Sequence, residues 1–236
     1  GLPPTHDGEY HVVRFHEFDK VLRRGEFYPR WTPDLNNGYG VPLFNYVYPF
    51  PNYIASLLHT IGISFIDAFK LNMFIALIVG AIFMYLWAGK FWGRLGGVIA
   101  SIFYSFAPYH LLDIYIRGSV GEVWTLAFFP AFLWAVTKFV REGQRHFLPI
   151  ASICLALIIF SHNILALMFI PFAISYAGFL VWGGSKGDRR VLWGSTLVFL
   201  LGIGLSTIFW LPALFERHYV RGLEIFNYSQ HFAEIY

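Results

Sequence analysis

Two carboxylates near the start of the chain are the first candidates for chemistry. They belong to the run His6-Asp7-Gly8-Glu9. A carboxylate within hydrogen-bond reach of a hydroxyl group can accept its proton as the oxygen attacks, so Asp7 and, second to it, Glu9 are candidate catalytic bases. Carboxylates and the flanking histidines are also metal ligands, and a divalent metal at Asp7 and Glu9 is the less favoured alternative. Asp7 could also serve only as a helix N-cap.

The composition indicates what kind of scaffold must hold these residues. The chain is 57% hydrophobic, 20% aromatic and 13% charged, whereas about 25% of the residues of a soluble domain are charged. Most of the chain therefore faces lipid, and membrane lipid is an expected partner. The net charge of +3 comes from basic residues scattered between apolar runs. They form no clustered basic surface, so no nucleic acid partner is expected.

Long runs without charged residues predict transmembrane helices. No Asp, Glu, Lys or Arg lies within residues 71–89, 95–112, 123–137, 146–185 or 191–215. About 20 apolar residues cross the bilayer core, and the fourth run suffices for two helices joined at Ser161-His162-Asn163. The alternation of a barrel strand is missing. We therefore predict an all-α, polytopic transmembrane helical bundle with about six spans in residues 65–215.

The loop charges predict which side of the membrane each loop faces. One set of loops is rich in basic residues: Lys90, Arg94, Lys138, Arg141, Arg145, Lys186, Arg189 and Arg190. By the positive-inside rule these loops are cytoplasmic. The N-terminal segment, residues 113–122, the turn at His162 and the region after Leu214 then share the non-cytoplasmic side. The reactive groups are therefore expected to converge there.

Residues 1–64 are predicted to form an external first loop with amphipathic and interfacial helices, and residues 216–236 begin a further external segment. In residues 9–24 the apolar side chains Val12, Phe15, Phe18 and Leu22 lie close to one face of a helix. The charged side chains of this helix are expected to lie in water. Residues 35–66 carry no charge, but prolines and asparagines interrupt them, and the longest remaining stretch spans about 20 Å. An interfacial or re-entrant segment is favoured there over a further span, which would invert the side of residues 1–34.

The chain starts at Gly1 with no hydrophobic element ahead of the acidic cluster. A translocated loop normally follows such an element. We therefore expect a fragment or a processed chain that lacks one preceding helix and continues beyond residue 236.

Short motifs along nearly the whole chain carry a family resemblance. They are Thr5-His6-Asp7-Gly8-Glu9-Tyr10-His11, Pro29-Arg30-Trp31, Asn37-Gly38-Tyr39-Gly40, Pro42-Leu43-Phe44, Arg117-Gly118-Ser119 with Glu122, Ser161-His162-Asn163 and Trp210-Leu211-Pro212-Ala213-Leu214. The chain resembles the bacterial and archaeal polytopic proteins labelled 6-pyruvoyl-tetrahydropterin synthase-related membrane domain, which are similar to GT-C-type glycosyltransferases. The resemblance implies an integral protein of the prokaryotic cell membrane that acts in the cell envelope, with its N-terminal loop on the non-cytoplasmic side.

The resemblance to GT-C enzymes also implies an activity. Such enzymes transfer a sugar from a polyprenyl-phosphate donor on the non-cytoplasmic face, here to an unknown glycan, lipid or protein acceptor. Acidic residues of their first external loop act as base or, in some members, bind a divalent metal. Asp7 matches the leading acidic position, while Glu9 departs from an Asp-x-Asp pair, so no metal is assured. Six further residues are expected to bind phosphate or sugar: Arg117, Glu122, His162, Asn163, Arg217 and Arg221. Among them, Glu122 is expected to position Arg117.

Other interpretations of these residues stay open. Arg117 with Glu122 could be a structural pair, His162-Asn163 only a turn, and the arginines after Leu214 snorkelling cations. The alternative function is a polytopic transporter or flippase-like protein, or a non-catalytic membrane scaffold. Transport sites place ionisable residues near the bilayer midplane, whereas the charges here collect at the helix ends, which favours an enzyme.

Overall fold

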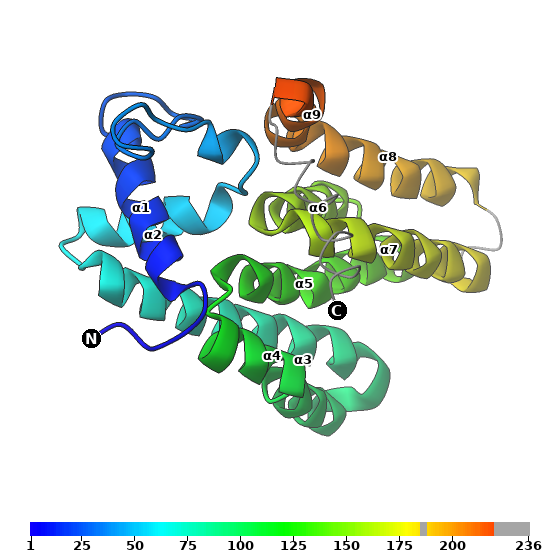
Figure 1. Cartoon of the computed structure of the whole chain (residues 1–236). Helices are drawn as coiled ribbons and strands as arrows, with labels where there is room; N and C mark the ends of the chain where they lie inside the picture. The colour runs from blue at the N-terminus through cyan, green and yellow to red at the C-terminus, as the bar shows by residue number, and fades with distance from the viewer. Residues whose placement is uncertain (185–187, 220–236) are drawn as a thin grey trace, which may run out of the picture.

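The computed structural model describes residues 1–184 and 188–219, which form a helical bundle with a smaller helical cap at one end (Figure 1). The cap contains α1 (Gly8–Leu22), η1 (Leu43–Asn45) and α2 (Phe50–Thr60). The bundle contains α3 (Phe65–Ser105), α4 (Pro108–Leu112), η2 (Asp113–Arg117), α5 (Val120–Glu142), α6 (Phe147–Ser161), α7 (Asn163–Gly184), α8 (Arg189–Leu205), α9 (Thr207–Glu216) and η3 (Arg217–Tyr219). Within these ranges the only β-type pairing is an isolated bridge between Thr32 and Val41. The predicted all-α membrane bundle is confirmed.

The long helix α3 is a hairpin of two antiparallel arms. Its backbone leaves helical geometry at Gly93, with φ 70° and ψ −176°, a conformation essentially restricted to glycine. The hydroxyl of Ser101 donates a hydrogen bond to the carbonyl of Ala81 at 2.8 Å. Those residues would lie about 30 Å apart in a straight helix. The turn lies between the charged residues Lys90 and Arg94, where the sequence predicts a loop between two apolar runs.

Several of these helices are suited to crossing a membrane. By length and composition, three stretches of the described residues qualify: Phe65–Arg117, Val120–Glu142 and Asn163–Gly183. A fourth results if α8 and the helices after it, bent by 63° to each other, form one span. α6 is apolar but has 15 residues. α2 has 11 and is about 16 Å long, too short to cross a bilayer alone. The predicted number of spans stays a prediction.

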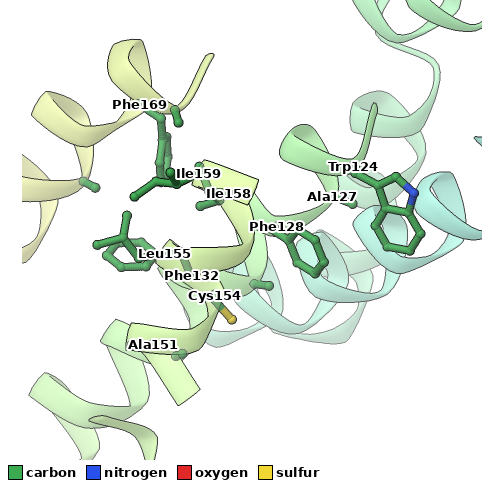
Figure 2. Close-up of a cluster of buried hydrophobic side chains, with 14 of the residues drawn as sticks. Trp124, Ala127, Phe128, Phe132, Ala151, Cys154, Leu155, Ile158, Ile159 and Phe169 are labelled. Atoms are coloured by element: carbon green, nitrogen blue, oxygen red, sulfur yellow. The ribbon is translucent and has the colours of Figure 1, made fainter. Parts of the chain in front are cut away.

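Helix α5 lies at the centre of the bundle and packs against α3, α6 and α7. Its small residues allow close approach: a Cβ added at Gly80 of α3 would lie 3.3 Å from the Cα of Ala127. Figure 2 shows how α5, α6 and α7 form the core with these buried side chains: Trp124, Ala127, Phe128, Phe132, Ala151, Cys154, Leu155, Ile158, Ile159 and Phe169. The core fixes the ends of α5, α6 and α7 relative to one another.

The cap is attached by the apolar face of α1. Phe15 is fully buried in the hydrophobic core that α1 shares with α3 and α5. Phe18 is fully buried within the cap, where it packs edge-on against Phe44 and Tyr53, with ring centroids 5.0 and 4.7 Å away. The predicted amphipathic helix is thus present.

The expectation that all the charges of this helix stay in water is wrong for two of them. Glu17 and Asp19 are 3% and 5% exposed. The loop after α1 folds back along the helix, and the backbone N–H of Asp34 donates to the Glu17 carboxylate at 3.3 Å. Asp19 is partnered locally by Arg23 at 2.6 Å.

Candidate functional site

A polar cavity of about 270 Å³ lies where the cap meets the bundle. Its walls come from α1, the segment between η1 and α2, the start of α5 and the turn between α6 and α7. The lining residues are Asp7, Arg14, Tyr46, Val47, Tyr48, Arg117, Ser119, Glu122, His162, Asn163 and Ile164. The structure therefore brings together most of the predicted site residues, although more than a hundred positions separate the first from the last.

The position of Asp7 is fixed by backbone hydrogen bonds. The N–H of His6 donates to the carbonyl of Ile116 at 3.0 Å, and the N–H of Asp7 donates to the carbonyl of Arg117 at 2.8 Å. Gly118 follows with φ 70° and ends η2. A Cβ there would lie 2.4 Å from the hydroxyl oxygen of Thr5, so glycine permits the N-terminal segment to pack against this turn.

The carboxylate of Asp7 has no side-chain partner among the described residues. Asp7 occupies the N-cap position of α1, yet its carboxylate makes no capping hydrogen bond. Among the described residues it has no other side-chain hydrogen bond or ion pair, and it is half-buried in the cavity wall. The N-cap interpretation therefore holds for its position on the helix but not for its carboxylate.

Glu122 is the most enclosed carboxylate of the cavity, at 2% exposed. The guanidinium of Arg117 donates to it at 2.7 Å, the hydroxyl of Ser119 donates at 3.2 Å, and the hydroxyl of Tyr109 also donates to it. The predicted contact between Glu122 and Arg117 is thus present. Ser119 is the N-cap residue of α5, but its hydroxyl makes no capping hydrogen bond to the helix backbone and is used on the Glu122 carboxylate instead.

Arg117 is held by a second carboxylate as well. Its Nη1 lies 3.1 Å from Oδ1 of Asp113, which is fully buried. The four-residue spacing of Asp113 and Arg117 is typical of a helical ion pair. Sequence reasoning assigned Asp113 no role at the site. With two carboxylates around it, the charge of Arg117 is neutralised within the protein.

His162 ends α6 with an extended backbone, φ −163° and ψ 121°. Its Nε2 lies 3.7 Å from Glu122, and its Nδ1 accepts a hydrogen bond from the N–H of Leu165 at 3.4 Å. Burial lowers the pKa of His162, against the opposing effect of Glu122. The imidazole is therefore neutral at pH 7, with its proton on Nε2.

Two further contacts complete the wall. The side-chain amide of Asn163 donates to the carbonyl of Tyr46 at 3.0 Å, which joins the start of α7 to the cap. The ring of Tyr48 lies 5.1 Å from that of His162. Burial raises the pKa of Tyr48 to about 12, so its hydroxyl keeps its proton and can donate.

Two predicted site residues lie outside the cavity, and one lies outside the described residues. Glu9 is exposed, because a residue two positions after Asp7 points about 200° away around a helix. Arg217 is exposed on η3 and does not line the cavity. Arg221 lies outside the described residues.

The geometry offers no ligand cluster for a metal at Asp7 and Glu9. Among the described residues, no group of three or more His, Cys, Asp or Glu side chains could hold a metal ion. His6 and Glu9 are exposed. His11 points into the core, where burial, Arg14 and His162 lower its pKa to about 3.

The fold and the cavity define an all-α membrane protein with a polar site at one end of its bundle. A family model for the 6-pyruvoyl-tetrahydropterin synthase related domain, described as a membrane protein, matches residues 44–236. The match covers more than half of the chain, so the chain belongs to this family. No curated protein and no solved structure matches it. The matched part contains Arg117, Glu122, His162 and Asn163, while Asp7 precedes it.

Proposed function

We propose that the protein is a GT-C-type membrane glycosyltransferase, which moves a sugar from a polyprenyl-phosphate donor to an acceptor hydroxyl on the non-cytoplasmic face. The observation that carries the proposal is the unpaired carboxylate of Asp7 in a cavity that also presents guanidinium, imidazole, amide and phenol groups. A base and several hydrogen-bond donors around one space are the groups that sugar transfer requires.

An apolar groove next to the cavity supports a lipid-linked substrate. The groove has a volume of about 390 Å³ and is lined by Ile159, Asn163, Ala166, Leu167, Ile170, Ile203, Phe209, Trp210, Ala213 and Leu214. Asn163 lines both spaces. A polar cavity beside an apolar groove, with Asn163 in the wall of both, suits an amphiphile that has its isoprenoid chain in the groove and its phosphate and sugar in the cavity.

The proposed reaction is a displacement at the anomeric carbon of the sugar. The acceptor hydroxyl oxygen attacks that carbon, and the bond from the carbon to the phosphate oxygen breaks. The polyprenyl phosphate leaves with the electron pair of that bond, and the carboxylate of Asp7 takes the hydroxyl proton. Cationic and hydrogen-bond-donating groups of the cavity stabilise the charge that develops on the phosphate.

The distribution of charged residues supports an enzyme over a transporter. Arg117, Glu122 and Asp113 pair with one another at one end of the helices. The charges at the opposite end also pair, since Lys90 and Lys138 lie 2.9 and 2.7 Å from Glu142. A transport site would place its ionisable residues near the middle of the bilayer.

Substitution of the proposed base tests this function. Asp7→Asn in the full-length protein should lower sugar transfer from a polyprenyl-phosphate donor by about a hundredfold or more, because the proton loses its acceptor. The measurement is product formation with each candidate donor sugar in membranes, with expression and unfolding temperature as checks on folding. Glu9→Gln is the matched control, since Glu9 lies outside the cavity, and should retain activity. Unchanged transfer by Asp7→Asn would remove the basis of the proposal.

A further inference from the structure

The two arginines that line the cavity differ in whether their charge is used. Arg117 pairs with the carboxylates of Glu122 and Asp113. Arg14 projects from α1 into the same cavity and is half-buried. Among the described residues, its guanidinium makes no hydrogen bond and no ion pair. Sequence reasoning selected Arg117 as an anion ligand and passed over Arg14.

Arg14 and Asp7 lie on one face of α1. They are seven positions apart, which is close to two helical turns, or about 10 Å along the axis. No ion pair joins them, and His11, between them on the same face, is buried against Phe15 and Phe69 instead. One wall of the cavity therefore presents an unpaired carboxylate at one end and an unpaired guanidinium at the other.

The surroundings of Arg14 suit an anion. Tyr48 lines the cavity with it, carries a protonated hydroxyl, and feels the charges of both Arg14 and Asp7. A partly desolvated cation without a partner is unfavourable unless a ligand supplies the opposite charge. At Arg117, by contrast, an incoming anion would meet two carboxylates that already hold the guanidinium.

We propose that Arg14, rather than Arg117, binds the phosphate group of the substrate in this cavity. The inference rests on the proposed function for its lipid-linked substrate, but the chemistry it needs is only that of a phosphate. A guanidinium matches two phosphate oxygens with two parallel hydrogen bonds. The separation of Arg14 and Asp7 leaves space for a sugar between the phosphate and the base, and Arg117 positions Glu122 and the turn at Gly118.

Binding measurements on the purified full chain in detergent test the proposal. The probes are a long-chain polyprenyl phosphate, the corresponding polyprenol, phosphatidylglycerol and inorganic phosphate. Arg14→Gln should weaken binding of the polyprenyl phosphate by about tenfold or more, because two charge-assisted hydrogen bonds are lost. The affinity of Arg14→Lys for the polyprenyl phosphate should lie between those of Arg14→Gln and the unchanged protein. The polyprenol lacks the phosphate, so its affinity should be the same for Arg14→Gln and the unchanged protein.

The controls separate a binding role from a structural one. Arg24→Gln removes an exposed arginine just beyond the end of α1 and should leave all affinities unchanged. An unaltered unfolding temperature for Arg14→Gln shows that the cavity persists. Competition by inorganic phosphate that disappears in Arg14→Gln also supports the site, with free phosphate as its source. Equal binding of every phosphate probe by Arg14→Gln and the unchanged protein would overturn the proposal.

The outcomes for this inference and for the proposed function are distinguishable. Phosphate binding that depends on Arg14, without sugar transfer from any donor, supports the phosphate site and contradicts the glycosyltransferase. A different outcome is that Asp7→Asn loses sugar transfer while Arg14→Gln keeps both the donor affinity and the rate of transfer. It supports the glycosyltransferase and overturns the role of Arg14.

Discussion

Glu122 organises the cavity at the level of single residues, since Arg117, Ser119 and Tyr109 all donate to its carboxylate. The sequence predicted the pairing with Arg117. It could not reveal Tyr109, because that residue reaches Glu122 only through the turn that η2 and Gly118 make between the second arm of α3 and α5. The free state of Asp7 was also unpredictable, because an N-cap residue normally uses its carboxylate on its own helix.

The Glu122 and Arg117 pair should show energetic coupling. Glu122→Gln removes the charge that holds Arg117 and should lower the free energy of unfolding by about 2 kcal/mol, and Arg117→Gln should cost a similar amount. Arg117 keeps Asp113 as a partner in the first variant and is partly exposed, which limits the loss. The double variant should be less destabilised than the sum of the two, by about 1 kcal/mol. Denaturant unfolding in detergent measures all four proteins; strictly additive losses would show that the pair is not coupled.

At the level of elements, α1 links the proposed chemistry to the bundle. The apolar periodicity predicted that Phe15 and Phe18 lie on one apolar face of the helix, and both are buried. Periodicity describes the faces of one helix and not the loop that later covers it, so the burial of Glu17 beside the backbone of Asp34 escaped prediction. The spacing of Asp7, His11 and Arg14 at positions i, i+4 and i+7 was a signal for a shared face. The structure shows that Asp7 and Arg14 line the cavity together.

Acid should loosen the attachment of α1 through His11. Burial lowers the pKa of His11 to about 3 in the folded protein, against about 6.5 in an unfolded chain. The unfolded state therefore binds the proton first, so the stabilisation is complete above pH 6.5 and declines as the pH falls toward 3, by up to about 1.4 kcal/mol per pH unit. Unfolding midpoints between pH 7 and 5 should fall less steeply for His11→Leu than for the unchanged protein. His16→Gln, at an exposed position of the same helix, should keep the full slope, and equal slopes in all three proteins would contradict this account.

At the level of the whole molecule, the charge-free runs predicted where the bundle helices lie, and the basic residues between them mark the end opposite the cavity. The turns between helices at residues 90–94 and at His162 could be predicted because charged or polar residues interrupt apolar runs there. The 63° bend between α8 and α9 could not be predicted, because it falls inside a charge-free run. Ser206 turns the chain there with its hydroxyl bonded to the carbonyls of Gly202 and Ile203. Hydropathy reports burial in lipid, and it contains no information on such backbone bends.

The two ends of the bundle should lie on opposite sides of the membrane, because the basic loops gather at one end and the cavity at the other. Replacing the buried Cys154 by alanine gives a background for single cysteines at the exposed positions Glu26, in the cap, and His146, at the start of α6. In intact cells an impermeant thiol reagent should label Glu26→Cys, whereas His146→Cys should react only after the cells are permeabilised. Both proteins should react equally in detergent, which controls for access within the fold. The reverse pattern would place the cavity on the cytoplasmic side, where a donor that presents its sugar outside the cell could not reach Asp7.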